Sequence, residues 1–217
     1  MSKTAIIAGA TGLTGKFLLQ LLIDSEIYSS VKVITRKTLD LNKPKVQEII
    51  TDFNTIDNFK HLLVADDVFC CLGTTIKKAK TKDAFKIIDM DYPLRIATLC
   101  KENKASQYLL ISSMGANPNS LIFYPKVKGM LEEELKKIGF DGLHIFRPSL
   151  LLGKRQEFRF GEYLGTAIYK LFAWTLIGKL KKYKGIKAEA VAFGMFKQAQ
   201  LNLKGIHIYE SDKIAYL

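Results

Sequence analysis

The sequence predicts an α/β fold in which a doubly wound parallel sheet is covered by helices on both faces. Three observations lead to this prediction. Short β-branched runs alternate with longer amphipathic segments, a glycine-rich turn follows the first of these runs, and Val68–Leu72 is apolar throughout. A continuous apolar run of that length is typical of a parallel strand that is buried on both faces. Because strand and helix patterns alternate along the chain, the strands are expected to be parallel.

Each element is predicted from its own local pattern. The expected strands, in chain order, are Ala5–Ala8, Val31–Thr35, Val46–Thr51, Val68–Leu72, Gln107–Ser112, Leu143–Phe146 and Ile206–Tyr209. The expected helices are Leu13–Asp24, Ile56–Leu63, Ala84–Glu102, Lys126–Ile138, Gly161–Gly178 and Ala188–Leu201. Pro93 is expected to break or restart the third helix, because proline removes a helical hydrogen bond. Gly139 is expected to close the fourth.

The chain is expected to form one domain over residues 1–217. No internal repeat, low-complexity tract or linker divides it, and its length suits a single substantial core. The hydrophobic content of 48% and charged content of 25% are ordinary for a globular protein. The pattern is less regular in the last third, where residues 149–205 are expected to form part of a reduced C-terminal cap on the substrate side.

The charge and the ends of the chain bear on location and partners. The formal net charge is +12, but the lysines are spread as short pairs and form no long basic block. This favours a solvated surface and disfavours nucleic acid as a partner, while steering of an anionic ligand stays open. No signal peptide and no membrane span are expected, so a cytoplasmic location is predicted. The adjacent Cys70 and Cys71 are expected to be buried free thiols. Whether the protein is a monomer or a dimer stays open.

A glycine-rich turn follows the first strand. Gly9, Gly12 and Gly15 have the spacing G-x-x-G-x-x-G and open a helical pattern. Gly9 permits a tight turn, Gly12 lets the backbone approach a pyrophosphate, and Gly15 allows the helix to pack closely on the strand. The phosphates would then lie on free N–H groups at the positive end of a helix. The turn predicts a Rossmann-like dinucleotide site, with Thr11, Leu13 and Thr14 also contacting the cofactor.

The end of the second strand favours one dinucleotide over another. An NAD-preferring site usually has an acidic residue there, whereas this chain has Thr35-Arg36-Lys37. A guanidinium can pair with a 2′-phosphate, so NADP(H) is preferred to NAD(H), with Arg36 and Lys37 as its contacts. The alternative is a surface Arg-Lys pair in a basic protein. Asp52 and Phe53, after the third strand, are expected to reach the adenine.

A candidate catalytic set lies downstream of this turn. Tyr124 and Lys128 are four residues apart, which places both side chains on one face of a helix. A nearby ammonium favours a phenolate, so such a tyrosine can act as a general acid or base. Ser112 and Ser113 end the preceding strand, where a hydroxyl can orient the tyrosine and bond a substrate carbonyl. Lys128 and Ser112 are also expected to contact the cofactor.

Four segments carry a resemblance to a known family. They are FCCLGTT at Phe69–Thr75, ISSMGA at Ile111–Ala116, YPKVKGMLE at Tyr124–Glu132 and FRPSLLLGKRQEFRFGE at Phe146–Glu162. In combination they resemble the atypical short-chain dehydrogenase/reductase superfamily, and more narrowly the small oxidoreductase-like proteins related to the Tat-interacting protein. The resemblance covers most of the chain and implies a Rossmann fold with bound NADP(H).

The resemblance also implies roles for individual residues. Ser113 would polarise the substrate, Tyr124 would donate or accept the proton, and Lys128 would assist the tyrosine. The resemblance further places Leu72, Gly73 and Thr74 at the nicotinamide ribose and Arg147, Pro148 and Ser149 beside the nicotinamide. The Asn-Asn-Ala-Gly element of many superfamily members is absent, and the segment after Pro148 is shorter than the substrate domain of the extended enzymes. Epimerase or dehydratase chemistry is therefore not expected.

Two functions remain in view. The first is an NADP(H)-dependent oxidoreductase acting on a small carbonyl or alcohol of unknown identity, and the alternative is a non-enzymatic NADP(H)-sensing regulator that binds a protein partner. No metal site is expected, because the three histidines lack partners at metal-ligand spacing. Glu132, Glu133 and Glu134 are expected to form an exposed helix face.

Overall fold

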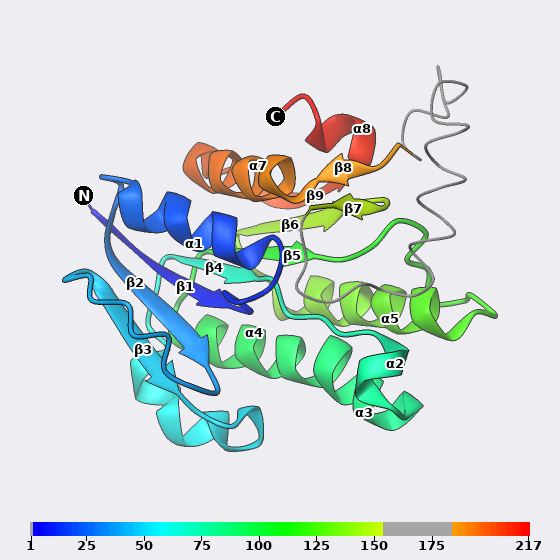
Figure 1. The fold of residues 1–217 in the computed structure, drawn as a ribbon, viewed down its shortest axis with the longest axis horizontal. Coiled ribbons are helices and arrows are strands. Elements are labelled where there is room, and N and C mark those ends of the chain that lie inside the picture. Colours follow the sequence, from blue (N-terminus) through cyan, green and yellow to red (C-terminus); the bar gives the residue numbers. More distant parts are fainter. Residues whose placement is uncertain (1, 154–183) are drawn as a thin grey trace.

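A computed structural model describes residues 2–153 and 184–217 and contains a seven-stranded, fully parallel sheet (Figure 1). The order of its strands is β3-β2-β1-β4-β5-β6-β9. These strands are β1 (Lys3–Ala8), β2 (Tyr28–Thr35), β3 (Val46–Ile50), β4 (Asp67–Cys70), β5 (Gln107–Ile111), β6 (Gly142–Arg147) and β9 (Gly205–Glu210). All seven strands predicted from the sequence are present, and the prediction of a Rossmann-like parallel α/β fold is confirmed.

Helices cover both faces of the sheet, as Figure 1 shows. One face carries α1 (Gly15–Asp24) and α7 (Ala188–Leu201), which pack against each other, together with α8 (Ser211–Ile214). The other face carries η1 (Phe53–Leu62), α4 (Tyr92–Glu102) and α5 (Phe123–Ile138). This is the doubly wound arrangement that alternating strands and helices predict.

The central strands are apolar throughout because their side chains alternate between two cores. In β1, Ala5 and Ile7 contribute to the core beneath α1 and α7, whereas Ile6 and Ala8 contribute to the core beneath α4 and α5. In β4, Phe69 lies in the first core and Val68 in the second. Successive residues of a strand point to opposite faces, so a strand covered on both faces needs no polar position.

The predicted long helix over Ala84–Glu102 is interrupted before Pro93, which lies where the α-helix restarts, as expected. It consists of α3 (Lys82–Lys86), one π-helical turn, η2 (Ile87–Asp91), and then α4, with Pro93 in the first turn of α4. Proline is tolerated there because the first N–H groups of a helix have no intrahelical partner. A short helix, α2 (Ile76–Ala79), precedes α3 and was not predicted.

The last third contains a second, two-stranded sheet. Its strands are β7 (Leu151–Leu152) and β8 (Ile186–Lys187), which pair in parallel. Helix α7 has the predicted bounds, and it packs on the main sheet beside α1. The predicted helix over Gly161–Gly178, and with it most of the expected cap, lies outside the described residues. In the part of the chain that the structure describes, no helix is both long and apolar enough to cross a membrane.

The parallel sheet brings distant parts of the sequence together at one edge. Because all seven strands run in the same direction, the segments that follow their carboxyl ends lie along a single edge. In sheets of this kind, ligands bind at that edge where the strand order reverses, which here is between β1 and β4. Every predicted site residue ends or follows one of these strands, or lies in α1 or α5.

Candidate functional site

The glycine-rich turn has the close packing that its glycines were expected to allow. Gly9 has a φ of +83°, and a Cβ there would lie 2.6 Å from the carbonyl carbon of Cys71. A Cβ on Gly15 would collide with the carbonyl oxygen of Gly9, whereas the Gly12 N–H donates to that same oxygen at 3.0 Å. The three glycines therefore form a turn whose backbone is exposed at Gly12 and tightly packed at the other two positions.

Thr14 in this turn has an unused hydroxyl. The residue is only 4% exposed, and within the described residues its Oγ1 is buried without a hydrogen-bond partner. Thr14 immediately precedes α1, where backbone N–H groups lack intrahelical partners and the helix dipole favours negative charge. A buried hydroxyl with no partner at such a position fits a phosphate group. Thr11 is exposed and Leu13 half-buried at the same turn.

Arg36 and Lys37 follow β2 and are exposed. The Thr35 hydroxyl donates to the Lys37 carbonyl oxygen at 2.7 Å, which shapes the turn that carries both cations. No hydrogen bond or ion pair of the Arg36 guanidinium is found within residues 2–153 and 184–217. The contact of Arg36 and Lys37 with a 2′-phosphate stays a prediction.

Asp52 and Phe53 have other contacts in the structure. The Asp52 carboxylate accepts from the Asn54 N–H at 3.0 Å and so caps η1. The Phe53 ring is 8% exposed and stacks on Tyr92, with ring centroids 5.0 Å apart. Phe53 therefore belongs largely to the core, and the predicted contact of both residues with adenine is untested.

Lys128 is buried beside a carboxylate that the sequence analysis did not single out. It is 3% exposed, and its Nζ lies 2.7 Å from Oδ1 of Asp89, which is 1% exposed. The other oxygen of Asp89 accepts from the Thr74 N–H at 2.7 Å. Burial alone would lower the pKa of Lys128, but the Asp89 carboxylate together with Tyr124 and Cys70 outweighs that effect, and the pKa is raised. Lys128 is thus a charged ammonium held next to the Gly73–Thr74 turn.

Tyr124 lies in the first turn of α5, and Ser113 lies in the loop that follows β5. The Tyr124 ring packs against Phe85, with centroids 5.5 Å apart. The Ser113 Oγ is buried and has no hydrogen-bond partner among the described residues. The loop that carries Ser113 is held against α5, because the Asn117 N–H donates to the Pro125 carbonyl at 3.0 Å and a Cβ on Gly129 would collide with Asn117 and Pro118.

Ser112, the neighbouring serine, has a different environment. It is 5% exposed, and its hydroxyl donates to Oε1 of Glu132. The Arg147 Nε donates to the same carboxylate at 3.1 Å, and the Arg147 guanidinium lies 3.7 Å from Glu210. Hydrogen bonding to Glu132, more than the opposing effect of burial, raises the pKa of Arg147. Of the two serines, only Ser113 keeps an unused hydroxyl among the described contacts.

The expectation that Glu132 lies on an exposed helix face is wrong. Glu132 is 1% exposed, while Glu133 and Glu134 form surface pairs with Lys136 and Lys137. Glu132 is four residues after Lys128, so it shares the inward face of α5. That spacing, counted from Tyr124 and Lys128, is the signal that would have identified Glu132 as buried.

The remaining predicted contacts are distributed along the same edge. Gly73 is exposed, and a Cβ there would lie 3.9 Å from the Lys128 Nζ, while Leu72 packs on the core beneath α4 and α5. Pro148 is buried, and its carbonyl accepts from the Met114 N–H at 3.0 Å. Arg147 is bound to Glu132, so its predicted place beside the nicotinamide is untested.

The cysteines and histidines contribute no second site. Cys70 and Cys100 are buried free thiols, as expected for Cys70, and burial raises the pKa of both, that of Cys100 to about 12. Cys71 is half-buried. His144 stacks on His207, with centroids 5.1 Å apart. Among the residues with described positions, no three His, Cys, Asp or Glu side chains gather as a metal site would require.

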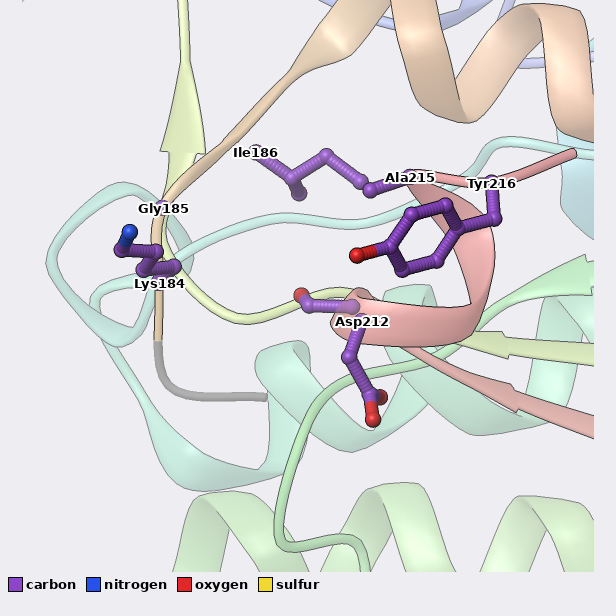
Figure 2. Close-up of a pocket in the computed structure, with 7 residues that line it drawn as sticks. Lys184, Gly185, Ile186, Asp212, Ala215 and Tyr216 are labelled. Atoms are coloured by element: carbon purple, nitrogen blue, oxygen red, sulfur yellow. The ribbon is translucent and has the colours of Figure 1, made fainter. Parts of the chain in front are cut away.

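Two hollows open near β7 and β8, and neither is lined by the candidate catalytic residues. One of about 320 Å³ is lined by residues of β8, α8 and the chain end, and in Figure 2 the Tyr216 hydroxyl points into it while the Asp212 carboxylate points away. Ser211 in its wall donates to the Ser149 hydroxyl at 2.9 Å. The other, of about 500 Å³, is lined by Lys16, Phe17, Leu152, Gly153, Lys187 and Glu189. Neither hollow includes Ser113, Tyr124 or Lys128.

The fold and the glycine turn at this edge define a class, which is that of Rossmann-like α/β proteins with a parallel sheet. Within it, the chain is 38% identical to Protein HTATIP2 of Rattus norvegicus, over 77% of this chain and 71% of the relative. It is 37% identical to "Protein FMP52, mitochondrial" of Candida albicans, over 97% of this chain and 93% of the relative. The chain belongs to the family of these proteins, as its four sequence segments predicted. No family model matches the chain.

Solved structures share the fold at low sequence identity. "MoeE5 in complex with UDP-glucose and NAD" has a TM-score of 0.73 at 15% identity, over 94% of this chain and 74% of that chain. A UDP-N-acetylglucosamine 4-epimerase from Methanobrevibacter ruminantium has a TM-score of 0.71 at 17% identity, over 96% of this chain and 76% of that chain. At such identity the likeness supports the Rossmann fold alone.

The relatives correct the prediction of a cytoplasmic location. Fungal relatives from Candida albicans, Aspergillus niger, Debaryomyces hansenii and Candida glabrata are all named mitochondrial. The prediction depended on seeing no signal peptide and no membrane span. Such an argument addresses secretion and membrane insertion, and it does not distinguish the cytoplasm from an organelle.

Proposed function

We propose that the protein is an NADP(H)-dependent oxidoreductase that transfers hydride to or from a small carbonyl or alcohol. One observation carries the proposal, namely that Ser113 has a buried hydroxyl without a described partner beside the helix that bears Tyr124 and Lys128. A buried polar group that the fold leaves unpaired indicates a ligand, because such groups are otherwise costly. The glycine turn follows β1 and lies at the same edge of the sheet, with β4 between β1 and the strand that precedes Ser113.

The residues at this edge fit the cofactor. The glycine turn and the Thr14 hydroxyl would hold the phosphates, and the Gly73–Thr74 turn with Lys128 would hold the nicotinamide ribose. When bound, NADP(H) supplies or accepts the hydride. In carbonyl reduction, Ser113 donates a hydrogen bond to the substrate oxygen and Tyr124 transfers its hydroxyl proton to that oxygen, so an alcohol and a phenolate result. Lys128 stabilises the phenolate, and the reverse sequence applies to alcohol oxidation.

The choice of NADP(H) over NAD(H) depends on Arg36. Its guanidinium has no described partner and is free to pair with a 2′-phosphate. We expect Arg36→Ala to weaken NADP⁺ binding at least tenfold, since a charge-assisted bond contributes about 1.5–3 kcal/mol, and to leave NAD⁺ binding within twofold. Calorimetric titration with both dinucleotides measures this difference. Equal affinity of the wild-type protein for NAD⁺ and NADP⁺ would contradict the proposed preference.

Turnover is tested by single-turnover oxidation of bound NADPH across a panel of small aldehydes and ketones. Tyr124→Phe removes only the hydroxyl and is expected to slow the reaction about 10²–10⁴-fold, with NADPH affinity unchanged. Glu134→Gln, on the exposed part of α5, is the matched control. Equal slow rates in the wild-type and Tyr124→Phe proteins would contradict catalysis and favour a non-enzymatic NADP(H)-sensing protein.

A mitochondrial location is proposed from the printed names of the fungal relatives. Fractionation of cells that express the full chain tests it. Recovery of the protein only in the cytosolic fraction would contradict this part of the proposal.

A further inference from the structure

Asp89 connects two parts of the candidate site. It lies in the π-helical turn η2 and is 1% exposed. Its two carboxylate oxygens have different partners: Oδ1 is 2.7 Å from the Lys128 Nζ, and Oδ2 accepts from the Thr74 N–H at 2.7 Å. One buried side chain thus joins α5 to the loop that follows β4.

The surroundings of Lys128 leave Asp89 as its charge partner. The ionisable groups that act on Lys128 are Asp89 from η2, Tyr124 from α5 and Cys70 from β4. Only Asp89 is a carboxylate, and it makes the described ion pair. A buried ion pair adds little net stability, because the cost of removing both charges from water offsets their attraction. The pair is therefore better explained by the placement of the lysine than by stability.

We infer that Asp89 is a positioning residue, which holds the Lys128 ammonium and the Thr74 amide in place for the nicotinamide half of the cofactor. The inference rests on the proposed function. A free lysine side chain samples many rotamers, and ordering it when a ligand binds weakens that binding. Because Asp89 already orders the Lys128 side chain in the folded protein, its conformational entropy is lost during folding and not when the ligand binds. Asp89 would touch neither the substrate nor the cofactor and would act through its two partners.

The experiment compares two ligands by calorimetric titration. NADP⁺ reaches both halves of the site, whereas adenosine 2′,5′-bisphosphate reaches only the half that contains the glycine turn and Arg36. We expect Asp89→Asn to weaken NADP⁺ binding about tenfold, the effect of ordering one or two side chains. The affinity for adenosine 2′,5′-bisphosphate should stay within twofold. A merely structural role would lower both affinities together.

Asp91→Asn is the matched control, because Asp91 lies in the same π-helical turn and is exposed. It should leave both affinities unchanged. Unfolding in urea of each variant establishes that the proteins titrated are folded. Where Asp89→Asn does not fold, the double variant Asp89→Leu/Lys128→Met removes both charges, and it should bind NADP⁺ several-fold more weakly than Lys128→Met alone, since Thr74 has also lost its acceptor.

The outcomes separate this inference from the function on which it rests. Wild-type affinity of Asp89→Asn for NADP⁺, an equal loss for both ligands, or equal NADP⁺ affinity of the double variant and Lys128→Met would overturn the positioning role. A wild-type protein that binds neither ligand would overturn the proposed function and this inference with it.

Discussion

Among the described residues, two lysine–aspartate pairs with a fully buried carboxylate lie at opposite edges of one sheet. Lys3 and Asp67 meet at the amino ends of the strands, with Nζ and Oδ2 3.0 Å apart, and Lys128 and Asp89 meet beyond the carboxyl ends. Asp67 also accepts from the Tyr28 hydroxyl at 2.7 Å and from the Gln107 side-chain amide at 2.6 Å. All of these partners lie on strands, so Asp67 fastens four neighbouring strands at their starts.

The partners of Asp89 are of another kind. They are a lysine on α5 and a backbone amide in a loop, both among the predicted site residues. Elsewhere at this edge, the hydroxyls of Ser113 and Thr14 are buried without a partner among the described residues. The comparison teaches that a buried charge pair is identified as structural or functional by what surrounds it. Around Asp67 the described contacts hold the strands of the sheet together, although the Gln107 Oε1 there is also buried without a described partner. Around Asp89 the described contacts join α5 to the loop after β4.

The largest effect on stability is expected at the Asp67 pair. Asp67→Ala leaves Lys3, Tyr28 and Gln107 without their shared acceptor, which should lower the free energy of unfolding by about 3–5 kcal/mol. Urea denaturation measures the change. Asp141→Ala, which removes an exposed pair with Lys101, should cost less than about 1 kcal/mol. A similar decrease in the free energy of unfolding in the two variants would contradict the expectation that Asp67 contributes more to stability than a surface ion pair.

A smaller effect on stability is expected from His144, which lies in β6 and, like Asp67, belongs to the sheet. Burial, with a contribution from His207, lowers the pKa of His144 to about 4, so the unfolded chain binds a proton more readily than the folded one. The stability contribution is complete above about pH 6.5 and is lost as the pH falls towards 4, by up to about 3 kcal/mol.

The measurement is the free energy of unfolding in urea at pH 7 and pH 5. His144→Phe retains an aromatic ring beside His207 and should reduce the acid-induced loss of stability. An unchanged pH dependence in this variant would show that His144 is not the group responsible.

The smallest effect on stability is expected at Glu132. Like Asp89, it binds predicted site residues, and like Asp67, it is a buried carboxylate with several partners. Glu132→Gln removes the charge that Arg147 and Ser112 bind and should cost about 1.5–3 kcal/mol. Glu133→Gln, one residue further on the outward side, should cost less than about 1 kcal/mol. Thermal unfolding measures both. A loss of NADP⁺ affinity in Glu132→Gln without a loss of stability would place Glu132 with Asp89 as a positioning residue.

The sequence predicted the strands well because each buried strand has its own apolar pattern. The ends of strands were less predictable, since pairing decides them: Ser29 and Ser30 are polar, yet β2 begins at Tyr28, which pairs with Lys3 of β1. The glycine turn and the residues Ser113, Tyr124 and Lys128 could be predicted as a candidate site because they lie in short motifs that follow strands or begin a helix.

The two buried acids were missed for separate physical reasons. Glu132 belongs to a run of three glutamates, which resembles a solvated face until it is counted from Lys128. Asp89 lies in a π-helical turn, which adds a residue to the helical repeat and shifts the faces that follow. A period of 3.6 residues therefore cannot assign its direction. Such a turn is visible only in three dimensions.

The close approach of Gly9 to Cys71 has a consequence for the size of any ligand at this edge. The backbones of the glycine turn and of the loop after β4 are in contact, with no space between them for even a methyl group. The strands that carry these loops, β1 and β4, are also paired over four residues. A molecule that spans both loops therefore meets two backbone segments whose spacing is set by this contact and by the strand pairing.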